Sequence, residues 1–513
     1  MKFYDGGVYL VNGAEVIPEE RAAEVEGLAG RRADKEEARQ GTIAWGILSS
    51  HDEAQGQEGR LRLRFDALSS HDGNYAGVIL AAYALEMDHF PLPYVMASCH
   101  STLCSGGSTA AADTHHFGAS AAQQYGGVWI PPHAAVLHRF VYERQARSGT
   151  MILGTSLHTR YGAMGVMGFK GQEADLVDHL LGKPCELDRP AVAAVYLTGA
   201  PRPSVGPQDV ALAILRSACA EDRMKGKVME FVGPGVSSLS LEHRCSIDLM
   251  TAEAGSVSSV WRTDEAVRDW AAMHGRPQDY KKLNPGDVAW YDGCLYVDLA
   301  DIHPMIALPF HPSNACEIGE LYGELEDTLH AVELAAEEIL EGRAPFTLRD
   351  KVEEGRLRVQ QGIIVGCAGG SFANIAAASR CMRGRSCGGF PLAVYPASQP
   401  VCLDLMRKGL WTDLAAAGAS VHTALCGPCV GGCDTPANGA LSIRHAVSNR
   451  ANLEGSRPER GQMAAVALMD ARSIAATAAN GGLLTSAEDM DVPWDDIPEY
   501  EYDEGAYDAL GVE

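Results

Sequence analysis

Three cysteines in two short loops constrain this chain more than any other feature of its sequence. Cys426 and Cys429 stand in the run Leu425-Cys-Gly-Pro-Cys-Val430, and Cys367 stands earlier in Val365-Gly-Cys-Ala-Gly-Gly370. Iron–sulfur clusters are held by Cys thiolates, usually four of them. A site with only three protein ligands leaves one metal position open, where a substrate can bind and be polarised.

Both loops are expected at the carboxyl ends of strands. The apolar pattern predicts a buried strand over 359–365, a helix over 372–380 and a second short strand over 420–425. Open α/β sheets build their ligand sites at the carboxyl ends of strands. The two cysteine loops are therefore predicted to face one site.

Other interpretations of the C-x-x-C pair stay open from the residues alone. Such a pair can also be a redox centre or half of a zinc site. A zinc ribbon needs a second close pair, and the nearby extra thiol is Cys433. A buried or spare thiol at Cys433 is favoured over a fourth ligand.

Length and composition indicate a multidomain protein. A chain of 513 residues exceeds the size at which single cores stop growing. Hydrophobic content of 46% and charged content of 21% are ordinary for a globular chain. The sequence has no apolar run near the ~18 residues of a membrane helix, and its first residues lack the apolar core of a signal peptide.

Cysteine usage and charge bear on compartment and partners. Fourteen cysteines without regular spacing predict reduced thiols and a cytoplasmic location. A net charge of −25 argues against nucleic acid as a partner. It leaves room for a local basic pocket that binds an acidic substrate.

The expected organisation is an α/β chain in four parts. Residues 1–205 form a first domain with a helical N-terminal extension over 19–40, 206–345 a second, 346–486 a third that carries the cysteines, and 487–513 an acidic tail. Single helices are expected over 208–220 and over 319–342. The tail is rich in Asp and Glu without Lys or Arg, which predicts a solvated, partly disordered extension.

Between about residues 60 and 482 the chain contains a series of short motifs, and the order in which they occur is informative. They are Arg62-Leu-Arg-Phe65 with His71-Asp72, Val136-Leu-His138 with Glu143, the stretches 151–165, 208–214 and 231–236, Glu253, the three cysteines, and Ser448-Asn449-Arg450. In this order they resemble the aconitase superfamily of iron–sulfur hydro-lyases and isomerases. Tyr395-Pro-Ala-Ser398 and 434–438 look most like its aconitase-like hydratase branch.

The resemblance implies an activity and a site. It implies a hydro-lyase (an aconitate hydratase-like lyase) that acts on a small hydroxy di- or tricarboxylic acid, with α/β domains around a cluster-binding cleft. Cys367, Cys426 and Cys429 would hold a [4Fe–4S] cluster. His158 would donate a proton to the leaving hydroxyl and Glu253 would lie near the reacting oxygens. Ser448, Asn449 and Arg450 would bind a substrate carboxylate, Arg450 with its planar fork.

The resemblance also implies a partner. Full-length relatives carry a mobile swivel domain with the catalytic serine base, and the motifs here cover only the three preceding domains. The chain is therefore expected to act as the large subunit of a two-part enzyme with a small swivel-domain subunit.

Several positions depart from the family pattern. Ser156 and Leu157 replace the acid and the serine of the Asp-Ser-His-Thr loop, Cys99-His100-Ser101 replaces Cys-Asp-His, and Leu249 replaces an asparagine. These departures support an alternative function, a catalytically inactive cluster-bearing protein that acts as an iron or oxygen sensor or assembly partner.

Overall fold

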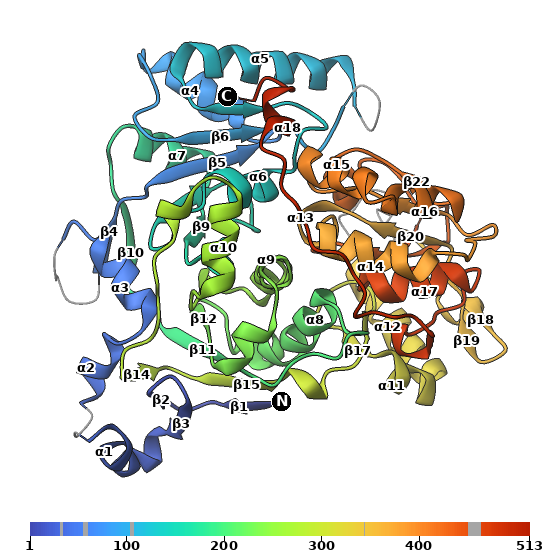
Figure 1. The fold of residues 1–513 in the computed structure, drawn as a ribbon, viewed down its shortest axis with the longest axis horizontal. Coiled ribbons are helices and arrows are strands. Elements are labelled where there is room, and N and C mark those ends of the chain that lie inside the picture. The colour runs from blue at the N-terminus through green and yellow to red at the C-terminus, as the bar shows by residue number, and fades with distance from the viewer. Residues whose placement is uncertain (31–33, 55–59, 103–106, 343, 450–462, 513) are drawn as a thin grey trace.

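Three large sheets with their helices surround a central helix, α9 (Leu241–Thr251), in the computed structural model (Figure 1). The structure describes residues 1–30, 34–54, 60–102, 107–342, 344–449 and 463–512. The mixture of parallel strands and covering helices confirms the α/β fold class.

The first sheet is wholly parallel, with the order β7-β6-β5-β8-β9. Its strands are β5 (Ala67–His71), β6 (Tyr94–Ala97), β7 (Val128–Ile130), β8 (Met151–Gly154) and β9 (Met167–Lys170). Helices α4 (Tyr75–Ala84), α5 (Thr109–Tyr125) and α7 (Glu173–Leu180) pack on one face and α6 (Leu137–Arg144) on the other. Strands buried on both faces need continuous apolar runs, as in β6.

The second sheet has the order β1-β15-β11-β12-β13, in which only β1 is antiparallel. Its strands are β1 (Lys2–Tyr4), β11 (Val192–Thr198), β12 (Val228–Val232), β13 (Ser258–Trp261) and β15 (Cys294–Asp298). Helices α8 (Pro207–Ala218), α9 and α10 (Glu265–Met273) follow its strands. A small neighbouring sheet joins β2 (Val8–Val11), β3 (Glu15–Pro18) and β14 (Val288–Tyr291).

The third sheet carries the cysteine loops and has the order β17-β16-β24-β23-β20-β21-β22. Its strands are β16 (Met305–Ala307), β17 (Ala315–Glu317), β20 (Gln361–Ile364), β21 (Leu392–Val394), β22 (Ser420–Val421), β23 (Leu441–His445) and β24 (Ala465–Met469). Helices α14 (Phe372–Met382), α15 (Gln399–Arg407), α16 (Leu410–Ala416) and α17 (Ala471–Ala479) accompany it. The five strands from β24 to β22 are parallel, so their carboxyl ends share one edge.

The sheets cross two of the domain boundaries expected from the sequence. Strand β11 lies before residue 206 but belongs to the second sheet, and β16 lies before residue 346 but belongs to the third. The helix expected over 319–342 is two helices, α11 (Ile318–Gly323) and α12 (Leu325–Leu340). The domain division itself stays a prediction.

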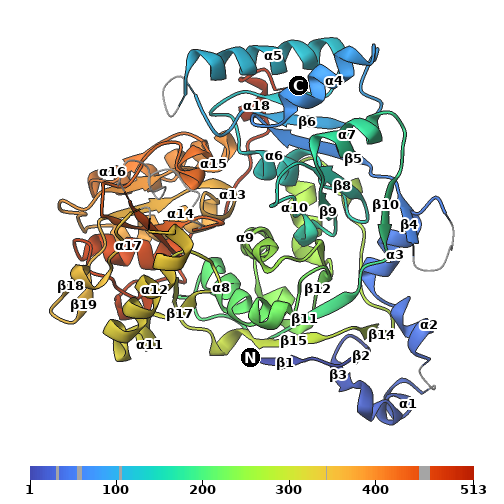
Figure 2. The same ribbon diagram turned by 180° about the vertical axis from the view of Figure 1, so that it is seen from behind.

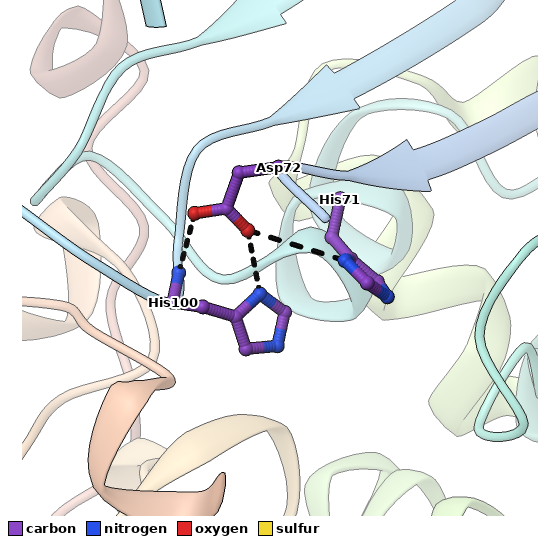
Figure 3. A group of neighbouring side chains, drawn as sticks. All are labelled: His71, Asp72 and His100. Atoms are coloured by element: carbon purple, nitrogen blue, oxygen red, sulfur yellow. Dashed lines mark hydrogen bonds and ion pairs between the residues drawn. The ribbon is translucent and has the colours of Figure 1, made fainter. Parts of the chain in front are cut away.

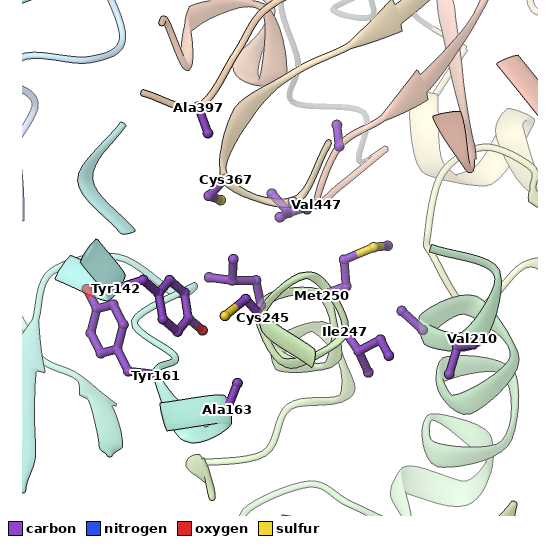
Figure 4. Packing of buried hydrophobic residues seen from close by; sticks show 14 of the residues in the cluster. Tyr142, Tyr161, Ala163, Val210, Cys245, Ile247, Met250, Cys367, Ala397 and Val447 are labelled. Atoms are coloured by element: carbon purple, nitrogen blue, oxygen red, sulfur yellow. The ribbon is translucent and has the colours of Figure 1, made fainter. Parts of the chain in front are cut away.

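Helix α9 is buried along nearly its whole length at the meeting point of the three sheets. Figure 4 shows its side chains pointing outward in different directions: Cys245 lies beside Tyr142 and Tyr161, and Ile247 faces Val210 of α8. Its buried Arg244 is paired with the Asp264 carboxylate at 2.8 and 2.9 Å, as a buried charge requires. Because α9 packs against elements of all three sheets, it holds the sheets in position around itself.

The C-terminal segment was expected to be solvated, and that expectation is wrong. From Trp494 the chain runs away from the third sheet to α18 (Gly505–Asp508), which packs on α6 and α15 (Figures 1 and 2). Tyr507 is fully buried, and its hydroxyl donates a hydrogen bond to the buried Glu143 carboxylate. Regularly placed aromatic residues among the acids give this segment the apolar surface that a solvated tail lacks.

The N-terminal extension is helical where the structure describes it. It comprises a short 3-10 turn (Glu19–Arg21), α1 (Ala23–Ala29) and α2 (Lys35–Arg39), followed by α3 (Ile43–Ser50). Asp34 caps α2 by accepting a hydrogen bond from the Glu37 backbone.

Candidate active site

A cavity of about 210 Å³ lies where the three sheets meet. The first sheet supplies its histidines and Cys99, the second supplies Glu253, and the third supplies the cysteines of the two predicted loops. Aliphatic side chains of Val136, Leu137, Leu157 and Val447 complete the wall. Among the described residues that line it there is no Lys or Arg.

The three predicted cysteines line this cavity together. Cys367 lies in the one-turn helix α13 (Gly366–Gly369), directly after β20. Cys426 immediately precedes a 3-10 turn, Gly427–Val430, and Cys429 lies within it. Gly366 has a φ of 76°, and a Cβ there would lie 3.7 Å from the Cys429 Sγ. This left-handed turn therefore requires glycine and brings the two loops together.

The chemistry of the donor set bears on the group it could hold. In the described part of the chain, the group whose ligand atoms all lie within 4.8 Å of one another is His71, Asp72 and His100, without any cysteine. The three predicted cysteines line one cavity, and cysteine thiolates are the ligands of iron–sulfur clusters. The donor set therefore fits the predicted cluster.

The thiols of the site differ in acidity. Hydrogen bonds with the Cys426 thiol lower the pKa of Cys99 and of Cys429 to about 6. The same hydrogen bonds raise the pKa of Cys426, while burial raises that of Cys367. Thiolate is the metal-binding form, so two of these residues are prepared for a metal near neutral pH.

His158 is held by a carboxylate from another sheet. Its Nε2 lies 3.0 Å from the Glu253 Oε1, and Glu253 is 5% exposed. Glu253 follows α9 in a single turn of 3-10 helix, Ala252–Ala254. The loop around His158 has Ser156 where the family pattern has an acidic residue. Glu253, from the second sheet, provides a carboxylate beside the histidine instead.

Ser156 takes a different role from the acid expected in that loop. Its hydroxyl accepts a hydrogen bond from the His158 backbone and lies 3.3 Å from the His138 Nε2. His138 Nδ1 lies 3.1 Å from the Tyr161 hydroxyl. Burial, together with the nearby His158, lowers the pKa of His138 well below its ordinary value, so the ring is neutral.

A second acid–histidine pair was missed by the sequence reasoning. Asp72, at the end of β5, accepts hydrogen bonds from the His100 backbone at 3.0 Å and from its Nδ1 at 2.6 Å (Figure 3). Burial opposes charge on His100, but Cys99 and then Asp72 raise its pKa well above the ordinary value. The motif Cys-Asp-His is absent in sequence, yet Asp72 from the neighbouring strand restores the pair.

His71 lies beside this pair. Its ring is 4.5 Å from that of His100, and burial followed by the charge on His100 lowers its pKa to about 3. In the sequence, His71 and Asp72 stand next to each other in a segment that carries the family resemblance, and this is the signal that could have found them.

The predicted carboxylate-binding segment is only partly brought to the cavity. Ser448 lines it, with an Oγ that has no hydrogen-bond partner among the described residues. The amide of Asn449 is 1% exposed and donates to the carbonyls of Ala307 and Leu308, away from the cavity. Arg450 and Arg457 lie outside the described residues, and Arg444 is buried behind the cysteine loop, where it donates to the Pro428 carbonyl at 2.7 Å.

The fold and the cavity together define an α/β protein that presents thiols, histidines and a carboxylate from three sheets to one site. The aconitase family (aconitate hydratase) matches residues 106–481, and the chain belongs to this family.

Individual relatives are similar at moderate identity. The 3-isopropylmalate dehydratase large subunit 2 of Archaeoglobus fulgidus is 27% identical over 60% of this chain and 67% of its own length. The mitochondrial aconitate hydratase of Gracilaria gracilis is 28% identical over 62% of this chain and 39% of its own length. An aconitase–ribosomal protein bL21m fusion protein of Schizosaccharomyces pombe is 26% identical over 61% of this chain and 33% of its own length. The chain thus spans between a third and two thirds of these relatives.

The helices of the described residues are all too short or too polar to cross a bilayer.

Proposed function

We propose that the chain is a hydro-lyase for a small hydroxy di- or tricarboxylic acid and uses a [4Fe–4S] cluster held by Cys367, Cys426 and Cys429. The observation that carries this proposal is the shared cavity: three sheets bring the cysteines, His158 and Glu253 to one place. When bound, such a cluster supplies a Lewis acid for the hydroxyl that leaves. The remaining chemistry falls to the side chains.

We assign proton transfer to two histidines of the cavity, His158 and His100. His158 is close enough to Glu253 for the carboxylate to fix the orientation of the ring. His100 is held the same way by Asp72. Since Asp72 engages Nδ1, a proton for the substrate would come from Nε2 of His100. These pairs replace the acids that the loop and the Cys-Asp-His motif lack, so they favour an active enzyme over the cluster-bearing sensor.

The lining of the cavity implies that the cations for the substrate come from other residues. A polycarboxylate needs positive partners, and the described lining residues include neither Lys nor Arg. We assign that role to Arg450, with Ser448 as a hydrogen-bond partner and Asn449 positioning the segment. Relatives named as dehydratase large subunits support a small subunit as a further source. We place the protein in a reducing compartment, the cytoplasm, because the cluster needs free thiolates.

Anaerobic reconstitution tests the proposal. Wild-type protein should bind iron and sulfide and show the broad visible absorption of a cluster, and each of Cys367→Ser, Cys426→Ser and Cys429→Ser should lose most of it. Cys381→Ser, a buried thiol remote from the cavity lining, is the matched control. The loaded protein, with and without a small subunit, is then screened against hydroxy acids. A zinc-filled site that takes up no iron would contradict the cluster.

A further inference from the structure

A buried arginine lies directly behind the C-x-x-C loop. Arg444 belongs to β23 of the third sheet and is 0% exposed. Its Nη1 donates to the Pro428 carbonyl at 2.7 Å and its Nε to the Ser442 hydroxyl at 3.3 Å. Its Nη2 is buried without a hydrogen-bond partner among the described residues. Both hydrogen-bond acceptors are uncharged, so they do not neutralise the guanidinium.

The surroundings of Arg444 differ from those of other buried arginines in the chain. Arg244 pairs with the Asp264 carboxylate at 2.8 Å, and Arg472 pairs with Asp470 at 3.2 Å. In the described part of the chain, Arg444 hydrogen bonds to no carboxylate. A buried charge without a counter-charge is strongly unfavourable. The position of Arg444 therefore suits an anion that the described side chains do not provide as a carboxylate.

The carboxylate that follows the C-x-x-C loop is engaged elsewhere. Asp434 accepts a hydrogen bond from the Tyr395 hydroxyl through its Oδ2. Its backbone carbonyl accepts another, from the Gln361 amide at 3.0 Å. These bonds hold Asp434 against β20 and the loop after β21, so it is no ion-pair partner for Arg444.

The geometry connects Arg444 with the predicted cluster ligands. The Pro428 carbonyl that it binds belongs to the peptide group joined to the Cys429 nitrogen, so the hydrogen bond is made to the C-x-x-C loop itself. Strand β23 also pairs with β20, where Arg444 is in register with Ile363, and β20 leads directly into the turn of Cys367. One side chain is thus fixed beside the strand of one ligand and bonded to the loop of the other two.

We propose that Arg444 is a positioning residue for the cluster: it holds the C-x-x-C loop through the Pro428 carbonyl and supplies a permanent positive charge behind the thiolates. This inference rests on the cluster assigned under the proposed function. Arg444 does not line the cavity, so the open metal position stays free for the substrate. Net charge is one of the factors that set the reduction potential of an iron–sulfur cluster. A fixed cation favours the added electron, so Arg444 raises that potential.

Three substitutions separate the charge from the hydrogen bond. Arg444→Lys keeps a positive charge, Arg444→Gln keeps a donor without charge, and Arg444→Met removes both. The full chain is loaded anaerobically, each cluster is reduced by one electron from dithionite, and the midpoint potential is read from the electron paramagnetic resonance signal of the reduced cluster. The potential should shift downward in Arg444→Gln and Arg444→Met and stay near the wild-type value in Arg444→Lys. Arg216→Met, at an exposed position of α8 outside the cavity lining, should leave it unchanged.

Iron retention reports on the loop contact. A chelator added to the loaded protein should remove iron several-fold faster from Arg444→Met than from wild type, because the C-x-x-C loop has lost its anchor. Arg444→Gln, which keeps a donor for the Pro428 carbonyl, should fall between the two. Equal rates for all three proteins would contradict the positioning role.

The outcomes distinguish this inference from the proposed function. A wild-type chain that takes up no iron overturns both. A loaded wild-type chain with the same midpoint potential as Arg444→Gln and Arg444→Met overturns the role of the charge and leaves the cluster intact. A potential in Arg444→Lys as low as that of Arg444→Met also contradicts it, since the charge is then not what matters. If Arg444→Met does not fold, as judged by circular dichroism, the comparison of Arg444→Lys with Arg444→Gln decides.

Discussion

At the scale of single residues, the site depends on carboxylates that reach histidines from other parts of the fold. Glu253 meets His158 across a sheet boundary, and Asp72 meets His100 from the adjacent strand. A histidine with one nitrogen fixed by a carboxylate has a defined ring orientation and a stabilised positive charge. Local sequence motifs that have lost their acids can therefore keep the chemistry.

Glu253→Gln should impair turnover without unfolding the protein. The amide keeps the shape of the carboxylate but not its charge, so His158 loses the carboxylate that orients its ring. We expect kcat to fall by about 10²-fold with little change in KM, measured anaerobically on the loaded enzyme with its active substrate. Glu265→Gln, at an exposed carboxylate of α10, is the control. Unchanged kcat together with unchanged iron content would remove Glu253 from the reaction.

At the scale of elements, the C-terminal segment ties the sheets together. Its aromatic side chains pack against helices of all three: Tyr507 against Phe140 of α6, Tyr500 against Trp270 of α10 and against Phe372 of α14. Ion pairs and hydrogen bonds add to this, including Arg407 with Asp503 and the Glu501 backbone with Asp404. The segment acts as a strap across helices that belong to all three sheets.

Tyr507→Phe should loosen this strap. The variant keeps the ring contact but leaves the buried Glu143 carboxylate without one of its donors, which costs about 1–3 kcal/mol. We expect a lower midpoint of thermal unfolding and faster proteolysis within 493–512. Tyr83→Phe, which alters a side chain 71% exposed, should change neither. Equal proteolysis of the two variants would argue against a docked strap.

Acid should also weaken the strap, through His274. This ring lies 4.0 Å from that of Tyr502, and its Nδ1–H donates to the Trp270 carbonyl at 2.8 Å. Burial lowers its pKa from 6.5 to about 3. The folded chain thus keeps the ring neutral while the unfolded chain binds a proton, so the stability present above pH 6.5 is lost as the pH falls toward 3.

The expected slope from this one group is about 1.4 kcal/mol per pH unit inside that window. His274→Phe keeps the ring contact and removes the titration, so its unfolding midpoint should fall less than that of wild type between pH 6.5 and 4. His89→Phe, at an exposed position, serves as the control. Parallel pH profiles for wild type and His274→Phe would contradict the assignment.

At the scale of the whole molecule, an acidic protein encloses the cavity for which we propose an acidic ligand. The net charge is −25, and the described cavity wall has no Lys or Arg. In the proposed function, the cations for such a ligand are assigned to Arg450 and to a small subunit.

The isolated chain should show little hydratase activity, and a small swivel-type subunit should restore it. The partner would bring the base and further cations to the cavity. Initial rates of loaded chain alone, partner alone and the mixture provide the measurement, with the Cys426→Ser chain plus partner as the control. Rapid dehydration by the chain alone would show that these residues already contain the base.

The sequence by itself determined the α/β class, the strand and turn that present Cys367, and the C-x-x-C loop, because these depend on apolar runs and glycine at fixed local spacing. Strand β20 and helix α14 agree with the expected ranges to within a few residues, whereas β22 ends at Val421, well before Cys426. The tertiary structure decided the rest. The Glu253–His158 and Asp72–His100 pairs, the approach of Cys99 to Cys426 and the burial of Tyr507 all join segments distant in the chain. Such contacts depend on how three sheets dock around α9, and local patterns carry no information about that docking.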